Sequence, residues 1–258
     1  MTTVKNIYDF INSIAPFDTQ EEWDNSGLLV GSPDDSVTGI LFALDVTEAV
    51  IDEALNLHAS VIVTHHPLMF SPRRRMTDED YEGRLISRLL RHSLSLIAVH
   101  TNLDRAPGGI NDMLAALCGL NVVPGEDFFR FGELTDPLPV RTFADILSET
   151  LSCTVRIMGP EDRTVRRVGV SSGGGGDAWE AAVSCGCDAF VTGEMKHHLA
   201  LAAADAGLVT MECGHYATEE PGLRALAEAL QKSLDTVEWN VGVFVSEVPA
   251  YTFPRQHP

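Results

Sequence analysis

Basic residues are scarce in this chain, and so are cysteines and long apolar runs. Lys and Arg number 18 against 37 Asp and Glu in 258 residues, a formal net charge of −19. A nucleic-acid backbone needs a basic surface, so this balance argues against a nucleic-acid partner. Every apolar run falls far short of the roughly 18–20 residues that cross a bilayer, so we expect no membrane span. The 45% hydrophobic share nevertheless predicts a sizeable folded core.

The few cysteines indicate reduced thiols. They are five in number and irregularly spaced: Cys118, Cys153, Cys185, Cys187 and Cys213. The N-terminus runs from Met-Thr-Thr straight into an amphipathic segment, and we expect no secretory signal there. Both features predict a cytoplasmic protein. The Cys-Gly-Cys spacing at 185–187 is not that of a zinc-binding Cys-x-x-Cys, so we expect no cysteine ligands.

Strand-length apolar runs alternate with helical patterns along the chain, which predicts an α/β fold with a large parallel share. Helices are expected over 4–14, 48–58, 79–92, 109–119, 143–151, 177–185, 196–206 and 219–232. Strands are expected at 27–30, 39–45, 60–64, 94–99, 153–158, 166–171, 188–192, 208–213 and 241–247. Thr47 and Thr142 are the expected caps of the second and fifth helices. The segment 121–140, which holds three prolines, is predicted to be an irregular connection between domains.

A faint internal repeat accompanies this alternation. Residues 49–64 resemble 177–192, and the strand at 95–99 matches 207–211 in the same order. The pattern fits either a duplicated α/β unit or chance similarity. A duplication would make the space between the two halves a natural place for a ligand.

Histidines gather at the ends of the predicted strands. His65 and His66 follow one strand, while His100 precedes Asp104 as His-x-x-x-Asp after the next. In the second half, His215 and Glu219 form a His-x-x-x-Glu unit. Each unit alone also fits a structural role, as a core histidine, a turn cap or an acid in a first helical turn. Because all three follow carboxyl ends of strands, we expect them to bind metal jointly.

The donor types indicate which metals and chemistry to expect. Imidazoles mixed with carboxylates suit Zn, Mn, Fe or Ni. The donors are too many for one tetrahedral ion with an open position, so we expect two ions sharing a bridging carboxylate. Such ions, about 3.5–4 Å apart, turn a bridging water into hydroxide near neutral pH. Hydrolysis of a phosphoester, an amide or a cyclic amidine would be compatible.

Several separate motifs resemble one known family over nearly the whole chain. They are Glu-Trp-Asp-Asn-Ser-Gly-Leu-Leu-Val-Gly at 22–31, Thr-His-His-Pro-Leu at 64–68, His-Thr-Asn-Leu-Asp at 100–104, Pro-Gly-Gly-Ile-Asn-Asp at 107–112, Thr-Gly-Glu-Met-Lys-His-His at 192–198 and Gly-His-Tyr-Ala-Thr-Glu at 214–219. The chain thereby resembles the GTP cyclohydrolase 1 type 2 homologues, also described as dinuclear-metal-centre hexameric proteins.

The resemblance implies two related α/β domains with mixed, largely parallel sheets and a metal site at the domain interface. We place the first domain at 1–125 plus 214–258 and the second at 126–213. The family also implies a toroidal homohexamer and two divalent metal ions per subunit. The implied ligands are His65, His66, Asp104, His215 and Glu219, with Glu219 as the expected bridge. Candidates for a near-site or catalytic role are His100, His197 and His198.

Several further segments have two possible interpretations. The glycines at 173–176 form either a phosphate cradle or a tight turn near the site. Trp23-Asp24-Asn25 either lines the pocket, with the indole stacking on a base, or is a loop tied down by a buried Trp. Lys196 and Arg105 either hold an anionic substrate or are solvated. The run Arg-Arg-Arg at 73–75 is expected to be a solvated or ion-paired loop.

The sequence therefore predicts a dinuclear metal-dependent hydrolase acting on a small phosphorylated or nucleotide-like substrate. The family name suggests opening of a guanine ring. The alternative is a metal-handling, metal-delivery or regulatory binding protein without turnover. A third possibility is a nucleotide sensor that performs no chemistry.

Overall fold

The computed structural model describes residues 2–123, 127–236 and 241–248. The chain forms two compact units, Met1–Leu103 with Leu223–Pro258 and Asp104–Gly222. The chain passes from one unit to the other within two helices, α4 (Thr101–Arg105) and α9 (His215–Thr236).

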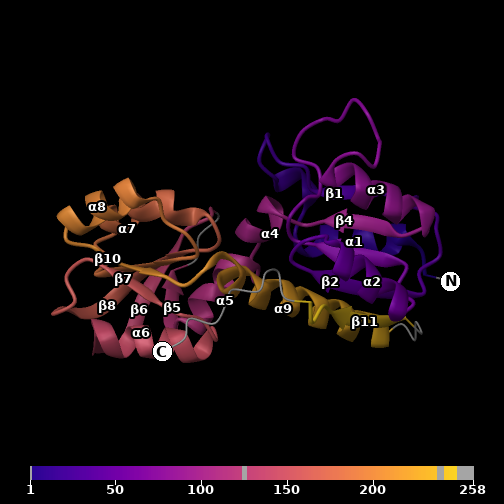
Figure 1. Cartoon of the computed structure of the whole chain (residues 1–258). Helices are drawn as coiled ribbons and strands as arrows, with labels where there is room; N and C mark the ends of the chain where they lie inside the picture. The colour runs from indigo at the N-terminus through magenta and orange to yellow at the C-terminus, as the bar shows by residue number, and fades with distance from the viewer. Residues whose placement is uncertain (1, 124–126, 237–240, 249–258) are drawn as a thin grey trace. The chain divides into compact units, whose positions relative to one another are not determined.

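The first unit is built on a five-stranded sheet of order β1-β4-β3-β2-β11 (Figure 1). Its strands are β1 (Gly27–Val30), β2 (Gly39–Ala43), β3 (Val61–Thr64), β4 (Ser95–Ala98) and β11 (Gly242–Val245). The last four are parallel, while β1 runs antiparallel to β4. The helices α1 (Val4–Ile14), α2 (Glu48–Asn56) and α3 (Tyr81–Arg91) belong to the same unit.

Local sequence explains the helices of this unit. In α1, Val4, Ile7 and Ile11 are buried at helical spacing, while Thr3 and Asn6 form a capping box. The predicted cap of α2 is confirmed, because the Thr47 side chain accepts a hydrogen bond from the Val50 amide.

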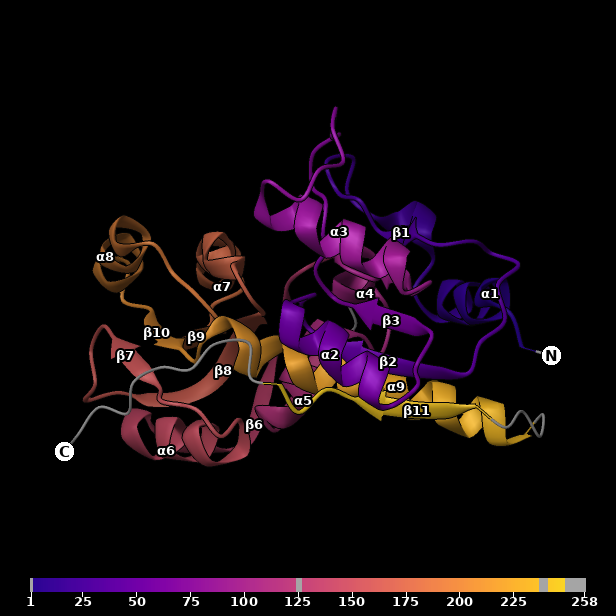
Figure 2. The same ribbon diagram turned by 45° about the vertical axis from the view of Figure 1, so that its right-hand side comes forward.

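The second unit contains a six-stranded sheet of order β5-β6-β8-β9-β10-β7. Its strands are β5 (Leu120–Val123), β6 (Arg130–Pro139), β7 (Arg156–Met158), β8 (Thr164–Ser171), β9 (Ala189–Thr192) and β10 (Val209–Glu212). Figure 2 shows α6 (Val140–Thr150) on one face and α7 (Trp179–Ser184) with α8 (His197–Asp205) on the other. Core clusters lie on both faces, around Phe143 and around Phe190.

Two expectations about the middle of the chain are wrong. Much of the segment 121–140 is a regular antiparallel pair, β5 with β6, rather than an irregular connection. Pro137 lies where the β6–β8 register shifts, and Pro139 is the last residue of β6, so both prolines are tolerated. Pro124 lies outside the described residues. The helix α6 begins at Val140 with Pro139 as its N-cap, so Thr142 is not the cap.

The two sheets share a run of topology. The first unit's β2-α2-β3-α3-β4 corresponds to the second unit's β8-α7-β9-α8-β10, with three parallel strands in each. In each unit an antiparallel strand, β1 or β7, pairs with the third strand of the run. This correspondence matches the similarity between residues 49–64 and 177–192. The predicted α/β fold with mixed, largely parallel sheets is confirmed.

The boundaries between the compact units fall within α4 and α9. The helix α5 (Ile110–Leu117) and β5 belong to the second unit, because β5 pairs with β6 and α5 packs into the same core. Domain boundaries near 125 and 213 stay a prediction for independently folding domains. Within the described residues, the structure contains no helix with the length and apolarity of a membrane span.

Candidate metal centre

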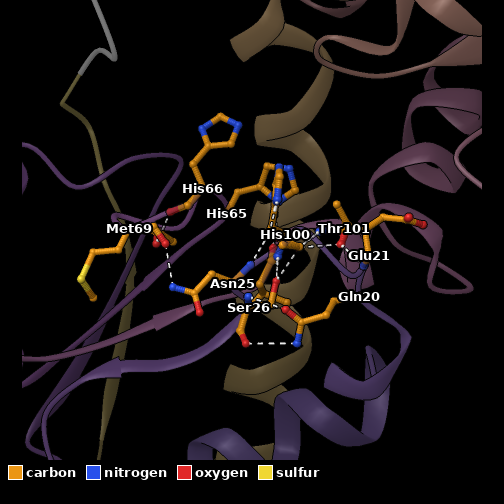
Figure 3. Close-up of polar contacts among 12 residues, drawn as sticks. Gln20, Glu21, Asn25, Ser26, His65, His66, Met69, His100 and Thr101 are labelled. Carbon is orange, nitrogen blue, oxygen red and sulfur yellow. Dashed lines mark hydrogen bonds and ion pairs between the residues drawn. The ribbon is translucent and has the colours of Figure 1, made fainter. Parts of the chain in front are cut away.

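Three imidazoles meet in the first unit. His65 and His66 directly follow β3, and His100 follows β4. Because these strands are parallel neighbours, their carboxyl ends lie at one sheet edge. The ring centroids of His65 lie 5.0 Å from His66 and 5.1 Å from His100, and one ring nitrogen of each of the three can be chosen within 4.8 Å of the others. Figure 3 shows the three side chains together with the loop of Asn25 and Ser26.

Each imidazole is held through its Nδ1 atom. The Nδ1 of His65 lies 2.8 Å from the Val99 carbonyl oxygen, which requires that Nδ1 carry the proton and donate it. His66 and His100 make the same 2.8 Å contact with carboxylate oxygens of Asp45 and Asp24. In the neutral tautomer that donates from Nδ1, the lone pair is on Nε2. All three rings are therefore set to coordinate through Nε2.

Asp24 is the most constrained carboxylate of this cluster. Its side chain is fully buried, and it accepts hydrogen bonds from His100, from the Thr101 amide at 3.0 Å and from the Ser26 hydroxyl at 3.1 Å. Burial would raise the pKa of Asp24, but the hydrogen bonds from His100 and Thr101 and the attraction of His100 hold that pKa well below its usual range. Asp24 is therefore ionised, and its carboxylate holds the Nδ1 atom of His100.

The second unit holds a histidine and a carboxylate one helical turn apart. His215 begins α9, and its Nε2 lies 3.2 Å from Oε1 of Glu219. The i, i+4 spacing brings both side chains to one face of the helix, as the sequence predicted. Glu219 is 4% exposed, and Glu194, which follows β9, lies 3.5 Å from Nδ1 of His215. Two acidic groups thus flank this imidazole.

The glycine-rich turn packs directly on this pair. A side chain at Gly173 would begin 1.8 Å from Oε1 of Glu219 and 3.0 Å from Nε2 of His215. Gly173 also has φ +51°, which favours glycine. Its amide donates to the Thr218 hydroxyl at 3.0 Å, and its carbonyl accepts from the Glu194 amide at 2.8 Å. The loop therefore forms a tight turn against the His215–Glu219 pair, which was one of its two interpretations.

Asn111 connects this turn to Asp104. Its Nδ2 donates to the Asp104 carbonyl oxygen at 3.0 Å, and its Oδ1 accepts from the Ser172 amide at 2.8 Å. Asn111 is 1% exposed, and Asp104 itself is buried in α4. One amide side chain thereby fixes the backbone at Asp104 and the start of the glycine-rich turn.

Within each unit, the structure brings some of the predicted site residues together. His65, His66 and His100 lie together in the first unit, and His215 lies against Glu219 in the second. Asp104 is joined through Asn111 to the turn beside that pair. By contrast, His197 and His198 are exposed in the first turn of α8. Among the described residues, neither belongs to a group of ligand atoms with metal-binding spacing.

Sequence reasoning missed the residues that orient the imidazoles. Asp45 follows β2, and Glu194 follows β9, so both occupy strand ends like the predicted ligands. This position directly after a strand is the sequence feature that could have identified both carboxylates. Asp24 was noted only beside Trp23, and the idea of a buried Trp is wrong because Trp23 is 60% exposed.

The basic side chains have ordinary partners. Arg73 pairs with Asp80 and Glu82, as expected for an ion-paired loop. Lys196 lies 3.6 Å from Asp177 in an exposed pair. The guanidinium of Arg105 lies 4.6 Å from the centre of the Phe128 ring.

The donor set fits a transition-metal or zinc ion. Imidazoles whose Nδ1 atoms donate to a carboxylate or a backbone carbonyl are typical of metal ligands, because the second hydrogen bond fixes the tautomer and orientation. In the first unit all three rings meet this condition. The second unit adds an imidazole beside a buried carboxylate. Both units therefore contain residues able to hold a divalent ion.

Comparison with known proteins agrees with the fold and these motifs. A family model for Duf34/NIF3 (NGG1p interacting factor 3) matches residues 2–250, so the chain belongs to this family. The Streptomyces coelicolor protein named GTP cyclohydrolase 1 type 2 homolog is 34% identical, over 96% of this chain and 92% of that protein. A protein of the same name from Clostridium acetobutylicum is 29% identical over 95% of each. The resemblance inferred from the motifs is confirmed.

Solved structures have the same fold. A Staphylococcus aureus protein superposes with a TM-score of 0.91 at 28% identity, covering 98% of this chain and 99% of that one. Reduced HcgD from Methanocaldococcus jannaschii superposes with a TM-score of 0.83 at 28% identity, over 96% and 98%.

Proposed function

We propose that this protein is a metal-dependent hydrolase that holds two divalent ions on His65, His66, Asp104, His215 and Glu219. One observation carries the proposal. The rings of His65, His66 and His100 each use Nδ1 for a hydrogen bond to an oxygen, which directs Nε2 toward coordination. A histidine that served only as core packing would not need two similarly anchored neighbours.

The ions would supply Lewis acidity, which activates water and stabilises negative charge on a reacting oxygen. The chain's own residues would supply orientation and proton transfer. Asp45 orients His66, and Asp24 orients His100. We assign His100 the role of proton donor or acceptor, because it lies beside His65 and His66 and its ring is oriented by the hydrogen bond from Nδ1 to Asp24. His197 and His198 remain weaker candidates, since both lie exposed on α8.

We propose a small phosphorylated or nucleotide-like substrate. Support comes from the relatives' name, GTP cyclohydrolase 1 type 2 homolog, and from the preference of paired cations for phosphoryl oxygens. A homohexamer in the cytoplasm is part of the same proposal.

Metal analysis of protein purified without added metal tests the centre. We expect about two ions per chain, tightly held, and hydrolysis of at least one member of a panel of GTP, phosphomonoesters and phosphodiesters. Asp104→Ala and His215→Ala should each lower the metal content and abolish turnover. His92→Ala, which replaces an exposed histidine at the end of α3, is the matched control. Two ions retained by His215→Ala would show that the ligand set is wrong.

The same experiment separates the alternative function. A metal-delivery protein should release its ions to an apo acceptor and show no turnover with any member of the panel. A hydrolase should retain its ions and lose activity only on chelation. A nucleotide sensor would show ligand-induced thermal stabilisation without product.

A further inference from the structure

Two large aromatic side chains stand exposed beside the imidazole cluster. Trp23 is 60% exposed and Phe70 is 48% exposed. Their rings lie 5.9 Å and 5.6 Å from the ring of His100, at 75° and 81° to its plane. Single exposed apolar residues are common on proteins and need no functional explanation. Two aromatic rings beside the same imidazole are less common and indicate a binding surface.

The loops that carry these rings are firmly held. The residue after Trp23 is the buried Asp24, which accepts hydrogen bonds from His100, Thr101 and Ser26. The next residue, Asn25, donates from Nδ2 to the carbonyl oxygen of Met69 at 2.6 Å, directly before Phe70 (Figure 3). Because this contact joins the two loops, the exposure of both rings is built into the fold and does not reflect a loose segment.

The negative charge of the chain bears on which chemical group Trp23 and Phe70 bind. With a net charge of −19, the protein offers little general attraction to an anion. A phosphate group would depend on bound cations, whereas an uncharged planar ring would gain from stacking on Trp23 and Phe70. The aromatic pair and the imidazole cluster therefore suit two different parts of one molecule.

We propose that Trp23 and Phe70 bind a planar heteroaromatic ring of the substrate next to the His65–His66–His100 cluster. This inference rests on the proposed function and narrows its substrate class to phosphorylated compounds that carry such a ring, as purine nucleotides do. Trp23 and Phe70 thus determine specificity for substrates that carry a ring, and His100 lies beside the bound ring.

Calorimetric titration with three probes tests the inference. Guanosine 5′-monophosphate carries ring and phosphate, guanosine carries the ring alone, and ribose 5-phosphate lacks the ring. On metal-loaded protein we expect the nucleotide to bind about tenfold or more tightly than ribose 5-phosphate, the scale of one base stacked on an aromatic side chain. Trp23→Ala should remove about that factor for the nucleotide and leave ribose 5-phosphate unchanged.

Two further variants separate stacking from folding. Trp23→Phe keeps an aromatic face and should restore most of the affinity. Tyr81→Ala removes another exposed aromatic side chain of the same unit, 52% exposed, and should change no affinity. Thermal unfolding of the two Trp23 variants should match that of the wild-type protein, because the Trp23 indole is largely in solvent. Phe70→Ala should weaken nucleotide binding in the same direction as Trp23→Ala.

Guanosine distinguishes failure of this inference from failure of the metal centre. Its binding should depend on Trp23 in metal-loaded and metal-free protein alike, whatever the metal analysis gives. Equal affinities for nucleotide and ribose 5-phosphate, an unchanged nucleotide affinity in Trp23→Ala, or no binding of any ring-bearing probe at millimolar concentration would each overturn the inference.

Discussion

The carboxylate of Asp45 accepts a hydrogen bond from Nδ1 of His66 at 2.8 Å. The loop after β2 therefore orients the imidazole that follows β3. Asp24 does the same for His100 from the loop before β1. The first unit therefore orients its histidines from loops distant in sequence, while the second unit uses one helical turn between His215 and Glu219.

Removal of the Asp45 charge should weaken metal binding without unfolding the protein. In Asp45→Asn the amide oxygen can still accept from His66, but the hydrogen bond that orients the ring no longer involves a charged acceptor. Metal affinity should fall about 10- to 100-fold, the usual effect of a lost partner of a metal-binding histidine. Competition with a chromogenic chelator measures it. Asp34→Asn, an exposed carboxylate of the same unit, is the control, and an equal loss in both variants would contradict the role of Asp45.

A methyl group at position 173 should disturb the His215–Glu219 pair. Gly173→Ala places a carbon within 1.8 Å of Oε1 of Glu219, at a φ of +51° that costs about 1 kcal/mol for a residue with Cβ. We expect lower metal content and a lowered midpoint of thermal unfolding. Gly174→Ala is the matched control, because its φ is −77° and nothing lies within 4 Å of the added carbon. The prediction is wrong if the two variants bind metal equally.

Loss of the Asn111 amide should affect both segments that it joins. Asn111→Ala leaves the Asp104 carbonyl and the Ser172 amide without their side-chain partner, which should cost about 1–3 kcal/mol each if water does not replace it. Asn111→Asp keeps the acceptor for the Ser172 amide but sets a buried carboxylate against the Asp104 carbonyl oxygen, so it should destabilise at least as much as Asn111→Ala. Urea unfolding gives the two stabilities. Wild-type stability in Asn111→Ala would contradict the role of both contacts.

Because Asp24 is ionised in the folded state, the free energy of unfolding should depend on pH in the acidic range. Its pKa is depressed in the folded state, so its contribution is fully present above the unfolded value of about 3.9 and is lost as pH falls through that range toward the folded value. Asp24→Asn removes this term. We expect the variant to be less stable than wild type at pH 7 and the difference to shrink below about pH 4.

Urea unfolding of metal-free protein at pH 7, 5, 4 and 3 checks this dependence. A difference between Asp24→Asn and wild type that stays constant over this range would show that the charge of Asp24 does not stabilise the fold. Asp34→Asn serves again as the variant whose stability should follow wild type.

Local sequence patterns predicted most helices and strands. The spacing of Val4, Ile7 and Ile11 gave α1 its bounds, and Thr47 marked the start of α2. Both signals depend on neighbouring residues, so sequence alone carries them. The β5–β6 pair was missed because its strands contain or border prolines, and only pairing with β8 shows that Pro137 lies at a register shift.

The candidate ligands could also be recognised from the sequence. His65 and His66 follow an apolar strand, and His215 with Glu219 has helical spacing, so each unit had a local signal. The residues that orient these ligands had no local sequence signal of comparable strength. Asp24 and His100 are 76 residues apart, and Asn111 lies 61 residues from Ser172. No periodicity spans such separations.

The sequence by itself thus determined the donor types, the strand ends that carry them and the family. The tertiary structure decided which nitrogen of each imidazole is held, which glycine lies against Glu219 and which aromatic rings stand exposed beside His100. The physical reason is the distance along the sequence over which each kind of interaction acts. Helix caps and hydrophobic periods act between residues within a few positions, whereas a hydrogen bond that selects a tautomer forms only after parallel strands bring distant loops to one edge of a sheet.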